Sequence, residues 1–181
     1  MKFEKTNFDG LLIIQPDVYK DSRGLFFESF NGKKYVEGGI TDKFVQDNIS
    51  ISCQNTIRGL HLQIGEKAQG KLCQTVFGNV LDIAVDLRVN SSTFTKYFSI
   101  ELSDENHLQL WIPKGFAHGF LVLSEKAIFS YKCTEFYDKE SERSILYNDP
   151  DLRINWGIEN PIVSEKDLKA LTFQQFKSQN L

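Results

Sequence analysis

Apolar residues along the chain recur in short runs with period-two alternation, the pattern of β-strands. In residues 80–88 every second side chain from Leu81 to Leu87 is apolar, which gives a strand one apolar face. Strands are also predicted at 11–14, 25–30, 44–52, 57–63, 70–77, 96–102, 107–113, 116–123 and 127–137. About nine or ten short strands without intervening helices indicate an antiparallel sandwich or barrel. We therefore expect a mainly β fold, with residues 1–181 forming a single barrel domain.

Turn residues between two of these runs predict how the strands connect. Gly78 and Asn79 separate residues 70–77 from residues 80–88, and a Gly-Asn pair between apolar runs is a two-residue hairpin signal. The sequence thus predicts that these two strands form a hairpin.

Helical signals occur at two places. A short helix is expected after Asn31, a good N-cap residue, and should stop at Gly38 and Gly39. Near the end of the chain, Ser164 is followed by acidic residues and a helical apolar pattern, which predicts an amphipathic helix running to about Lys177. One C-terminal helix should therefore close the chain.

Composition narrows the possible classes of protein. The net charge of -3 gives no general attraction for nucleic acid. Cys53, Cys73 and Cys133 are an odd set without CxxC spacing, typical of reduced thiols in a cytosolic protein. The first ten residues contain no apolar signal-peptide core, and no run approaches the roughly 18 apolar residues of a membrane span. We expect a soluble cytoplasmic protein that binds neither nucleic acid nor membranes.

Residues 44–63 carry polar side chains where core-facing strands should be apolar. Alternation in residues 57–63 places His61 on the same face as Ile57 and Gly59, opposite Arg58. A glycine inside a strand often marks a bulge, and a bulge at Gly59 would let Arg58 and His61 face one cavity. The alternative is a hydrogen-bonded core histidine beside a solvated arginine.

The histidines argue against a catalytic metal. Residues 113–118, PKGFAH, have the spacing of the second motif of cupins, small jelly-roll barrels whose metal sites usually use a His-x-His pair. Here the residue two after His61 is Gln63, and His107 lies in a polar turn. Three nitrogen ligands for one iron or zinc ion are therefore not expected. Histidines in a metal-free barrel are better suited to be acids, bases or hydrogen-bond donors.

Several ordered segments together resemble the dTDP-4-dehydrorhamnose 3,5-epimerase family over almost the whole chain. These segments are DSRGLFFESF, FVQDNIS, TIRGLHLQ, QGKLCQTVFGNVLDIAVDLR, ELSDENHLQLWIPKGFAHGFLVLS, YKCTEFYDKESER, NDPDLRINW and VSEKD. The resemblance implies a cupin-like antiparallel jelly roll without metal or cofactor. It implies inversion of C3 and C5 of dTDP-4-keto-6-deoxy-D-glucose on the path to dTDP-L-rhamnose. It also implies a homodimer in which N-terminal strands cross between subunits.

The same resemblance assigns catalytic roles to four residues. His61 would be the base, and Asp167 the carboxylate that orients it. Lys71 would stabilise the enolate that forms at the C4 oxygen. Tyr131, a phenol with an ordinary pKa of about 10, would donate a proton opposite His61. Without the resemblance, Asp167 would be assigned to a helix cap, Lys71 to a solvated strand edge and Tyr131 to ordinary strand packing.

The resemblance also implies which residues bind the substrate. Arginine forks suit the paired oxygens of a diphosphate, a role expected for Arg23 and Arg58. Phe26 is a candidate to stack on the thymine, and Tyr137 a weaker candidate to line the cavity. The full expected set is Arg23, Phe26, Glu28, Gln46, Asn48, Arg58, His118, Tyr137, Glu142 and Lys166. The residues alone would also allow Arg23 to be a turn residue and Glu142 and Lys166 to be solvated charges.

Three other functions remain open from the sequence. A related epimerase could invert only C3 or only C5 with the same base and acid. A cupin could bind a sugar nucleotide without catalysis, although pure binding needs no base opposed by an acid. A metal-dependent oxygenase is the third, and metal analysis of the purified protein would test it.

Overall fold

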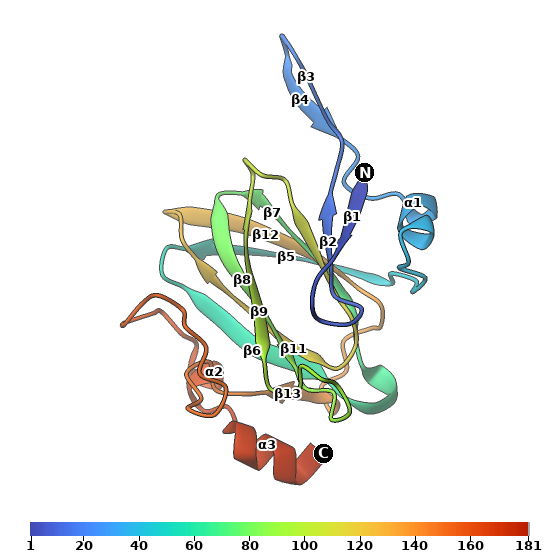
Figure 1. Cartoon of the computed structure of the whole chain (residues 1–181). Coiled ribbons are helices and arrows are strands. Elements are labelled where there is room, and N and C mark those ends of the chain that lie inside the picture. Colours follow the sequence, from blue (N-terminus) through green and yellow to red (C-terminus); the bar gives the residue numbers. More distant parts are fainter. Residues whose placement is uncertain (181) are drawn as a thin grey trace.

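The computed structural model describes residues 1–180 and contains two facing antiparallel β-sheets, a projecting hairpin and a few short helices (Figure 1). The first sheet has the order β1-β2-β10-β7-β12-β5, and the second has the order β13-β6-β11-β8-β9. The strands are β1 Lys2–Lys5, β2 Leu12–Gln15, β3 Val18–Asp21, β4 Gly24–Phe27, β5 Gln46–Cys53, β6 Ile57–Gln63, β7 Lys71–Phe77, β8 Asn79–Asp86, β9 Tyr97–Ser103, β10 Gln109–Ile112, β11 Phe116–Val122, β12 Lys126–Cys133 and β13 Glu142–Ser144. The helices are α1 Gly32–Glu37, the 3₁₀ turn Gly65–Lys67, α2 Glu165–Leu168 and α3 Phe173–Asn180. The expected antiparallel, cupin-like jelly roll is confirmed.

Both faces of β8 are largely buried, which explains why its apolar residues are not confined to the alternating positions from Leu81 to Leu87. Val80 and Ala84 point into the core between the two sheets. Ile83 and Val85 lie on the other face, where they pack in one cluster with Phe176 of α3. Each such side chain contributes about 1.5–3 kcal/mol when fully buried. The C-terminal segment therefore covers a sheet face that would otherwise be exposed.

The predicted hairpin between β7 and β8 is wrong. The two strands are consecutive, but β7 pairs with β10 and β12 in the first sheet, and β8 pairs with β9 and β11 in the second. Gly78 forms the corner between the sheets with a φ of +78°, and a Cβ there would lie 2.2 Å from the Lys126 carbonyl oxygen. The glycine thus marks a crossing from one sheet to the other.

The N-terminal region contains two strands that the sequence pattern missed. β1 pairs with β2 at the edge of the first sheet, and β3 pairs with β4 in a separate two-stranded hairpin. This β3–β4 hairpin projects away from the barrel (Figure 1). The strands missed are β1 and β3, whereas the strand expected at 25–30 is present as β4 and ends at Phe27. Apolar side chains of the hairpin are exposed, with Tyr19 of β3 at 65% and Phe26 of β4 at 71%. The helix predicted after Asn31 is present as α1, whose Lys33 and Lys34 N–H groups donate to the Asn31 side chain.

The prediction of one continuous C-terminal helix is also wrong. α2 ends at Leu168 and α3 begins at Phe173. Between them Leu171 adopts an extended form, donating its N–H to the Ser144 carbonyl at 3.1 Å and accepting from the Leu146 N–H at 2.9 Å. This bridge to the chain after β13 replaces helical hydrogen bonds and divides the helix in two.

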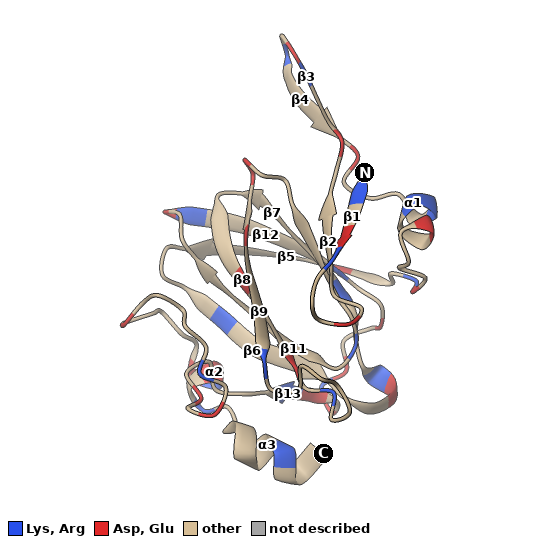
Figure 2. Ribbon diagram, viewed as in Figure 1, with Lys and Arg blue, Asp and Glu red and all other residues tan. Residues whose placement is uncertain are grey.

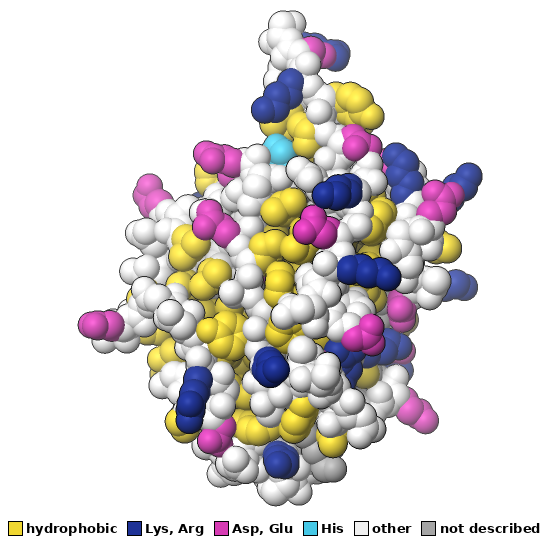
Figure 3. Space-filling view, in the orientation of Figure 1, with side chains coloured by type: hydrophobic (Ala, Val, Ile, Leu, Met, Phe, Trp, Pro, Cys, Tyr) yellow, Lys and Arg dark blue, Asp and Glu magenta, His cyan; other side chains and the backbone are white. Residues whose placement is uncertain are grey.

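Charged residues of both signs are interspersed along the elements (Figure 2). The face in Figure 3 shows the same mixture, with hydrophobic side chains between the charges. The face in Figure 3 therefore does not show the concentrated basic patch typical of nucleic-acid binding. In the part of the chain that the structure describes, no helix is long and apolar enough to cross a membrane.

Candidate active site

The barrel contains a cleft of about 670 Å³. Its wall is built from strands of both sheets and from α2. Among its lining residues are Asn48, Ser50 and Ser52 of β5, Arg58 and His61 of β6, Lys71 of β7, His118 and Phe120 of β11, Tyr131 of β12, and Lys166 and Asp167 of α2. A smaller adjoining hollow shares Asn48, His61, Lys71 and Tyr131 with it. The two hollows therefore form one continuous site.

A bulge in β6 brings Arg58 and His61 to the same cleft. His118 of β11 pairs with His61 and Phe120 pairs with Arg58, so three residues of β6 span the length of two residues of β11. Gly59 makes this possible: its φ is +131°, and a Cβ there would lie 2.6 Å from the Gly119 Cα. The expected bulge and its consequence are confirmed.

His61 and Asp167 form a hydrogen-bonded pair at the cleft. Nε2 of His61 lies 2.7 Å from Oδ1 of Asp167, and the Gly59 N–H donates to Oδ2 at 3.5 Å. The His61 side chain is 32% exposed and that of Asp167 is 5% exposed. Burial raises the pKa of Asp167, but the hydrogen bond and charge of His61 outweigh it and hold that pKa below its ordinary value. The carboxylate therefore remains ionised and fixes the imidazole.

The N-terminus of α2 places Asp167. Ser164 caps the helix and accepts the Asp167 N–H at 3.1 Å, while the Asp167 carboxylate turns toward His61. Only one half of the capping box is therefore formed. Ser164 caps the helix, whereas the Asp167 carboxylate binds His61 in the cleft.

Lys71 and Tyr131 lie on the opposite sheet from His61. The Lys71 ammonium lies 3.5 Å from the His61 carbonyl oxygen and 5.7 Å from the centre of the Tyr131 ring. Lys71 is only 9% exposed, so its charge acts in a poorly solvated place. Burial raises the pKa of Tyr131 to about 12. A basic imidazole, an ammonium and a protonated phenol thus meet in one cavity.

Polar side chains from β5 orient further groups in the site. The Arg58 Nε–H donates to the Ser52 hydroxyl at 3.0 Å. Gln46 donates to Asn48 at 3.0 Å and accepts the Tyr137 N–H at 2.8 Å. Ser52 was not among the predicted site residues, although its place in a polar strand beside Arg58 is the signal that could have identified it.

Three of the predicted substrate-binding residues pair with one another at the rim. Lys166 donates to Oε2 of Glu142 at 2.6 Å, and the Tyr137 hydroxyl donates to the same oxygen at 3.1 Å. Burial raises the pKa of Glu142, but its bonds to Lys166 and Tyr137 lower it overall. This arrangement connects the loop after β12, β13 and α2 across the opening of the cleft.

The remaining three predicted residues do not line this cleft. Arg23 binds Asp21 at 2.6 Å in the β3–β4 hairpin, with 88% of its side chain exposed. Phe26 lies in the same hairpin, and Glu28 at its base binds Lys34 at 2.8 Å. The chain thus brings seven of the ten predicted binding residues to its own cleft and leaves Arg23, Phe26 and Glu28 in or beside the hairpin.

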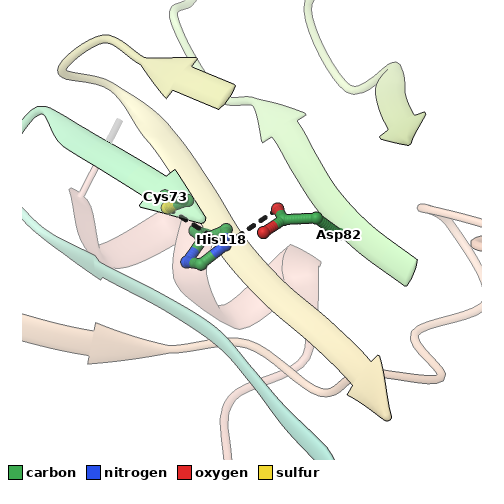
Figure 4. Close-up of side chains that lie close together, drawn as sticks. All are labelled: Cys73, Asp82 and His118. Carbon is green, nitrogen blue, oxygen red and sulfur yellow. Dashed lines mark hydrogen bonds and ion pairs between the residues drawn. The ribbon is translucent and has the colours of Figure 1, made fainter. Parts of the chain in front are cut away.

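A second histidine–aspartate pair lies below the cleft floor. Nε2 of His118 is 2.9 Å from Oδ1 of Asp82 and 3.8 Å from the Cys73 sulfur (Figure 4). Burial is the main reason that the pKa of His118 lies below its ordinary value. Asp82 and Cys73 were not predicted as site residues, because the alternation of residues 80–88 places Asp82 on the face opposite the apolar one and Cys73 reads as a small core thiol.

Comparison with known proteins identifies the family. The sequence model of the dTDP-4-dehydrorhamnose 3,5-epimerase family matches residues 5–175. The chain belongs to this family. Among curated relatives, the dTDP-4-dehydrorhamnose 3,5-epimerase of Shigella flexneri is 49% identical over 174 residues, which covers 96% of each protein.

Solved epimerase structures have the same fold. The dTDP-4-dehydrorhamnose 3,5-epimerase of Elizabethkingia anophelis superposes with a TM-score of 0.92 at 53% identity, covering 100% of this chain and 99% of that chain. An epimerase from Legionella pneumophila, solved with dTDP-4-keto-L-rhamnose, gives a TM-score of 0.93 at 48% identity, covering 98% of this chain and 95% of that chain.

Proposed function

We propose that this protein epimerises dTDP-4-keto-6-deoxy-D-glucose at C3 and C5, giving dTDP-4-keto-L-rhamnose for the synthesis of dTDP-L-rhamnose. One observation carries the proposal: the His61–Asp167 pair faces a cleft whose other sheet supplies Lys71 and Tyr131. Family membership supports the same conclusion. We also propose that residues 1–181 act as one epimerase domain and that the reaction uses no metal or cofactor.

The reaction needs a base on one face of the sugar and an acid on the other. C3 and C5 both flank the C4 ketone, so loss of either proton gives an enolate. His61 takes the proton, and Asp167 stabilises the imidazolium that forms. The electron pair moves to the C4 oxygen, where the Lys71 ammonium stabilises the negative charge. Tyr131 then gives its proton to the same carbon from the opposite face, and both side chains exchange protons with water before the next inversion.

The environment of each side chain suits this assignment. The raised pKa of Tyr131, about 12, keeps its phenol protonated and able to donate at neutral pH. The low exposure of Lys71 strengthens its attraction for a developing enolate. The exposed part of His61 gives a substrate access to the imidazole. These three properties support catalysis rather than binding alone.

We assign the nucleotide and the diphosphate to the rest of the cleft. Arg58 would bind phosphate oxygens, because Ser52 holds Nε and none of residues 1–180 bonds the terminal guanidinium nitrogens. Gln46, Asn48 and His118 would contact the nucleotide or sugar. The ligand would also contact the rim residues Tyr137, Glu142 and Lys166. There it must either replace the hydrogen bonds among these three side chains or add hydrogen bonds to them.

We propose a homodimer in which the β3–β4 hairpin of one subunit completes the cleft of the other. The hairpin projects from the barrel and holds Arg23 and Phe26 outside the cleft of its own subunit (Figure 1). The edge strand β5 supports an interface, since Ile49 is 69% exposed and Ile51 is 59% exposed. We also propose a cytoplasmic location, supported by three free thiols.

The function is tested with dTDP-4-keto-6-deoxyglucose in deuterated water. Proton NMR follows the H3 and H5 signals, and a reductase in a parallel sample traps the product. We expect both signals to disappear and the trapped product to be dTDP-L-rhamnose. Loss of one signal with inversion at one carbon would replace the proposal with a single-position epimerase, and no exchange would leave a binding protein. Activity lost to a chelator and restored by metal would indicate metal-dependent chemistry instead.

The subunit arrangement is tested by mixing two inactive variants. Arg23→Ala removes the hairpin guanidinium, and His61→Asn removes the base. If the hairpin serves the neighbouring cleft, a mixed dimer has one site with both groups intact, and equal mixing restores about a quarter of wild-type activity. Mixtures that stay inactive although subunits exchange, or a monomer by analytical ultracentrifugation, would contradict this arrangement.

A further inference from the structure

Three potential metal ligands meet in the core below the cleft. Cys73 comes from β7 in the first sheet, whereas Asp82 of β8 and His118 of β11 come from the second, and their side chains point toward one another (Figure 4). The sulfur, one carboxylate oxygen and one imidazole nitrogen all lie within 4.8 Å of one another. Strands in regular pairing hold all three, so the cluster does not depend on a mobile loop.

The hydrogen bonds inside this cluster leave one polar atom unused. Asp82 is 0% exposed, and its Oδ1 bonds Nε2 of His118 at 2.9 Å. Among residues 1–180, the other oxygen, Oδ2, has no hydrogen-bond partner. A buried, unpaired carboxylate oxygen is costly, and such groups are usually satisfied by a hydrogen bond or a cation.

The donor set suits one class of cation. Thiolate, imidazole and carboxylate together are ligands of zinc and similar first-row metals, whereas magnesium and calcium prefer oxygen alone. A divalent ion with one thiolate, one carboxylate and a neutral imidazole has zero net charge. Such a neutral unit is compatible with a buried position.

Two of the three donor-atom separations are close to those that a zinc ion needs. Donor atoms of a tetrahedral site lie about 3.3–3.5 Å apart, because Zn–N and Zn–O bonds are about 2.0 Å and Zn–S bonds about 2.3 Å. Nε2 of His118 lies 2.9 Å from Oδ1 and 3.8 Å from Sγ, on either side of that range. Shifts of a fraction of an ångström would place both neighbours of Nε2 at ligand distance.

The surroundings would protect and orient the bound ion. The His118 ring stacks on Phe129 with centroids 6.0 Å apart, and Phe120 and Phe129 are themselves stacked at 4.3 Å. Such an apolar shell fixes the imidazole and limits water. His118 also lines the cleft, so the cluster directly adjoins that cavity.

We propose that Cys73, Asp82 and His118 form a binding site for a zinc-like divalent cation in the barrel core, separate from the His61–Asp167 pair. The ion takes no part in the epimerisation. It replaces the thiol proton of Cys73, bonds the carboxylate of Asp82 and ties the two sheets together. Binding only to the folded chain raises thermal stability.

Cobalt and zinc binding to the full-length protein tests the site. Protein stripped with a chelator is titrated with Co²⁺, whose thiolate complexes give a charge-transfer band in the near ultraviolet, and then with Zn²⁺, with bound metal measured after gel filtration. We expect one ion per chain, a thiolate band and a higher melting temperature. Cys73→Val should weaken binding by more than about a hundredfold, beyond the effect typical of residues that only support a ligand.

Matched variants make the outcome decisive. Cys53→Ser, which changes an exposed thiol, should bind metal as wild type does. Asp82→Asn gives a second ligand change if Cys73→Val fails to fold, as judged by circular dichroism. Absence of the thiolate band in wild type, or equal metal binding by wild type and a folded Cys73→Val variant, would overturn the proposal. Metal bound instead by His61 and Asp167 would survive Cys73→Val and also count against it.

Discussion

The two histidine–aspartate pairs have the same chemistry and opposite access to solvent. His61 and His118 are direct neighbours across β6 and β11, and each has an aspartate within 2.9 Å of its ring nitrogen. The His61 side chain is 32% exposed, whereas that of His118 is 6% exposed. The exposed imidazole of the first pair can exchange a proton with a ligand, whereas His118, which also lines the cleft, is nearly buried against aromatic rings. Access, and not the hydrogen bond itself, therefore separates the candidate base from the buried pair.

The largest effect should come from matched His→Asn substitutions. His61→Asn removes the base and should lower kcat by about 10²–10⁴-fold while dTDP binding stays near wild type. His118→Asn, the control on the neighbouring strand, should lower kcat by less than about tenfold because no proton passes through it. Steady-state kinetics and dTDP titration measure both. If both variants fold and lose kcat equally, the two histidines do not differ in their role in the reaction.

Substitution of Arg58 tests whether the anionic ligand binds beside the exposed His61–Asp167 pair. Arg58→Met keeps much of the aliphatic side chain but removes the guanidinium, so dTDP affinity should fall about 10–100-fold. Arg143→Met is the control, since Arg143 binds the carbonyls of Glu140 and Glu142 and lines neither hollow of the cleft. Calorimetric titration with dTDP measures the affinity of each variant relative to that of the wild type. Unchanged affinity in Arg58→Met would rule out its phosphate role.

Asp82→Asn should affect stability more than turnover. The substitution removes a buried charge-assisted bond to His118, so the free energy of unfolding should fall by about 1–3 kcal/mol. Urea unfolding of chelator-treated protein measures this loss, and the same sample gives kcat. A large fall in kcat with unchanged stability would assign the buried pair to the reaction.

The smallest effect should be on how the free energy of unfolding changes with acid pH when Asp167 of the exposed pair is substituted. The pKa of Asp167 in the folded protein lies below its ordinary value of 3.8, since the bond and charge of His61 outweigh burial. Its contribution to stability is therefore full above about pH 4 and is lost as pH falls through the lowered folded value. Urea unfolding between neutral pH and pH 3 should show a shallower acid loss in Asp167→Asn. Glu165→Gln, at an exposed ion pair, should leave the acid dependence unchanged.

Local pattern predicted most of the strands and the bulge because both depend on neighbouring residues, although it missed β1, β3 and β13. Alternation located the buried faces, and Gly59 between Arg58 and His61 indicated the irregularity that places both at the cleft. Asn31 and Gly38 likewise marked the ends of α1. These features follow from backbone preferences that a short window contains.

Long-range pairing could not be inferred in this way. Gly78 and Asn79 gave a turn signal, but a turn does not specify which sheet the next strand joins. The partner of Asp82 stands 36 residues away, and the partner of His61 stands 106 residues away. Family resemblance suggested the His61–Asp167 pair, whereas the local pattern placed Asp82 on the polar face of its strand and Cys73 among ordinary core residues.

The position of β2 has a consequence for synthesis and folding. Leu12 of β2 pairs with Trp111 of β10, so β2 is joined to the rest of the first sheet by a strand about a hundred residues later in the chain. On the ribosome, the first strands remain without this partner until β10 has emerged. Closing so large a loop before the sheet is complete favours slow folding, in milliseconds to seconds, as in other β-folds of high contact order.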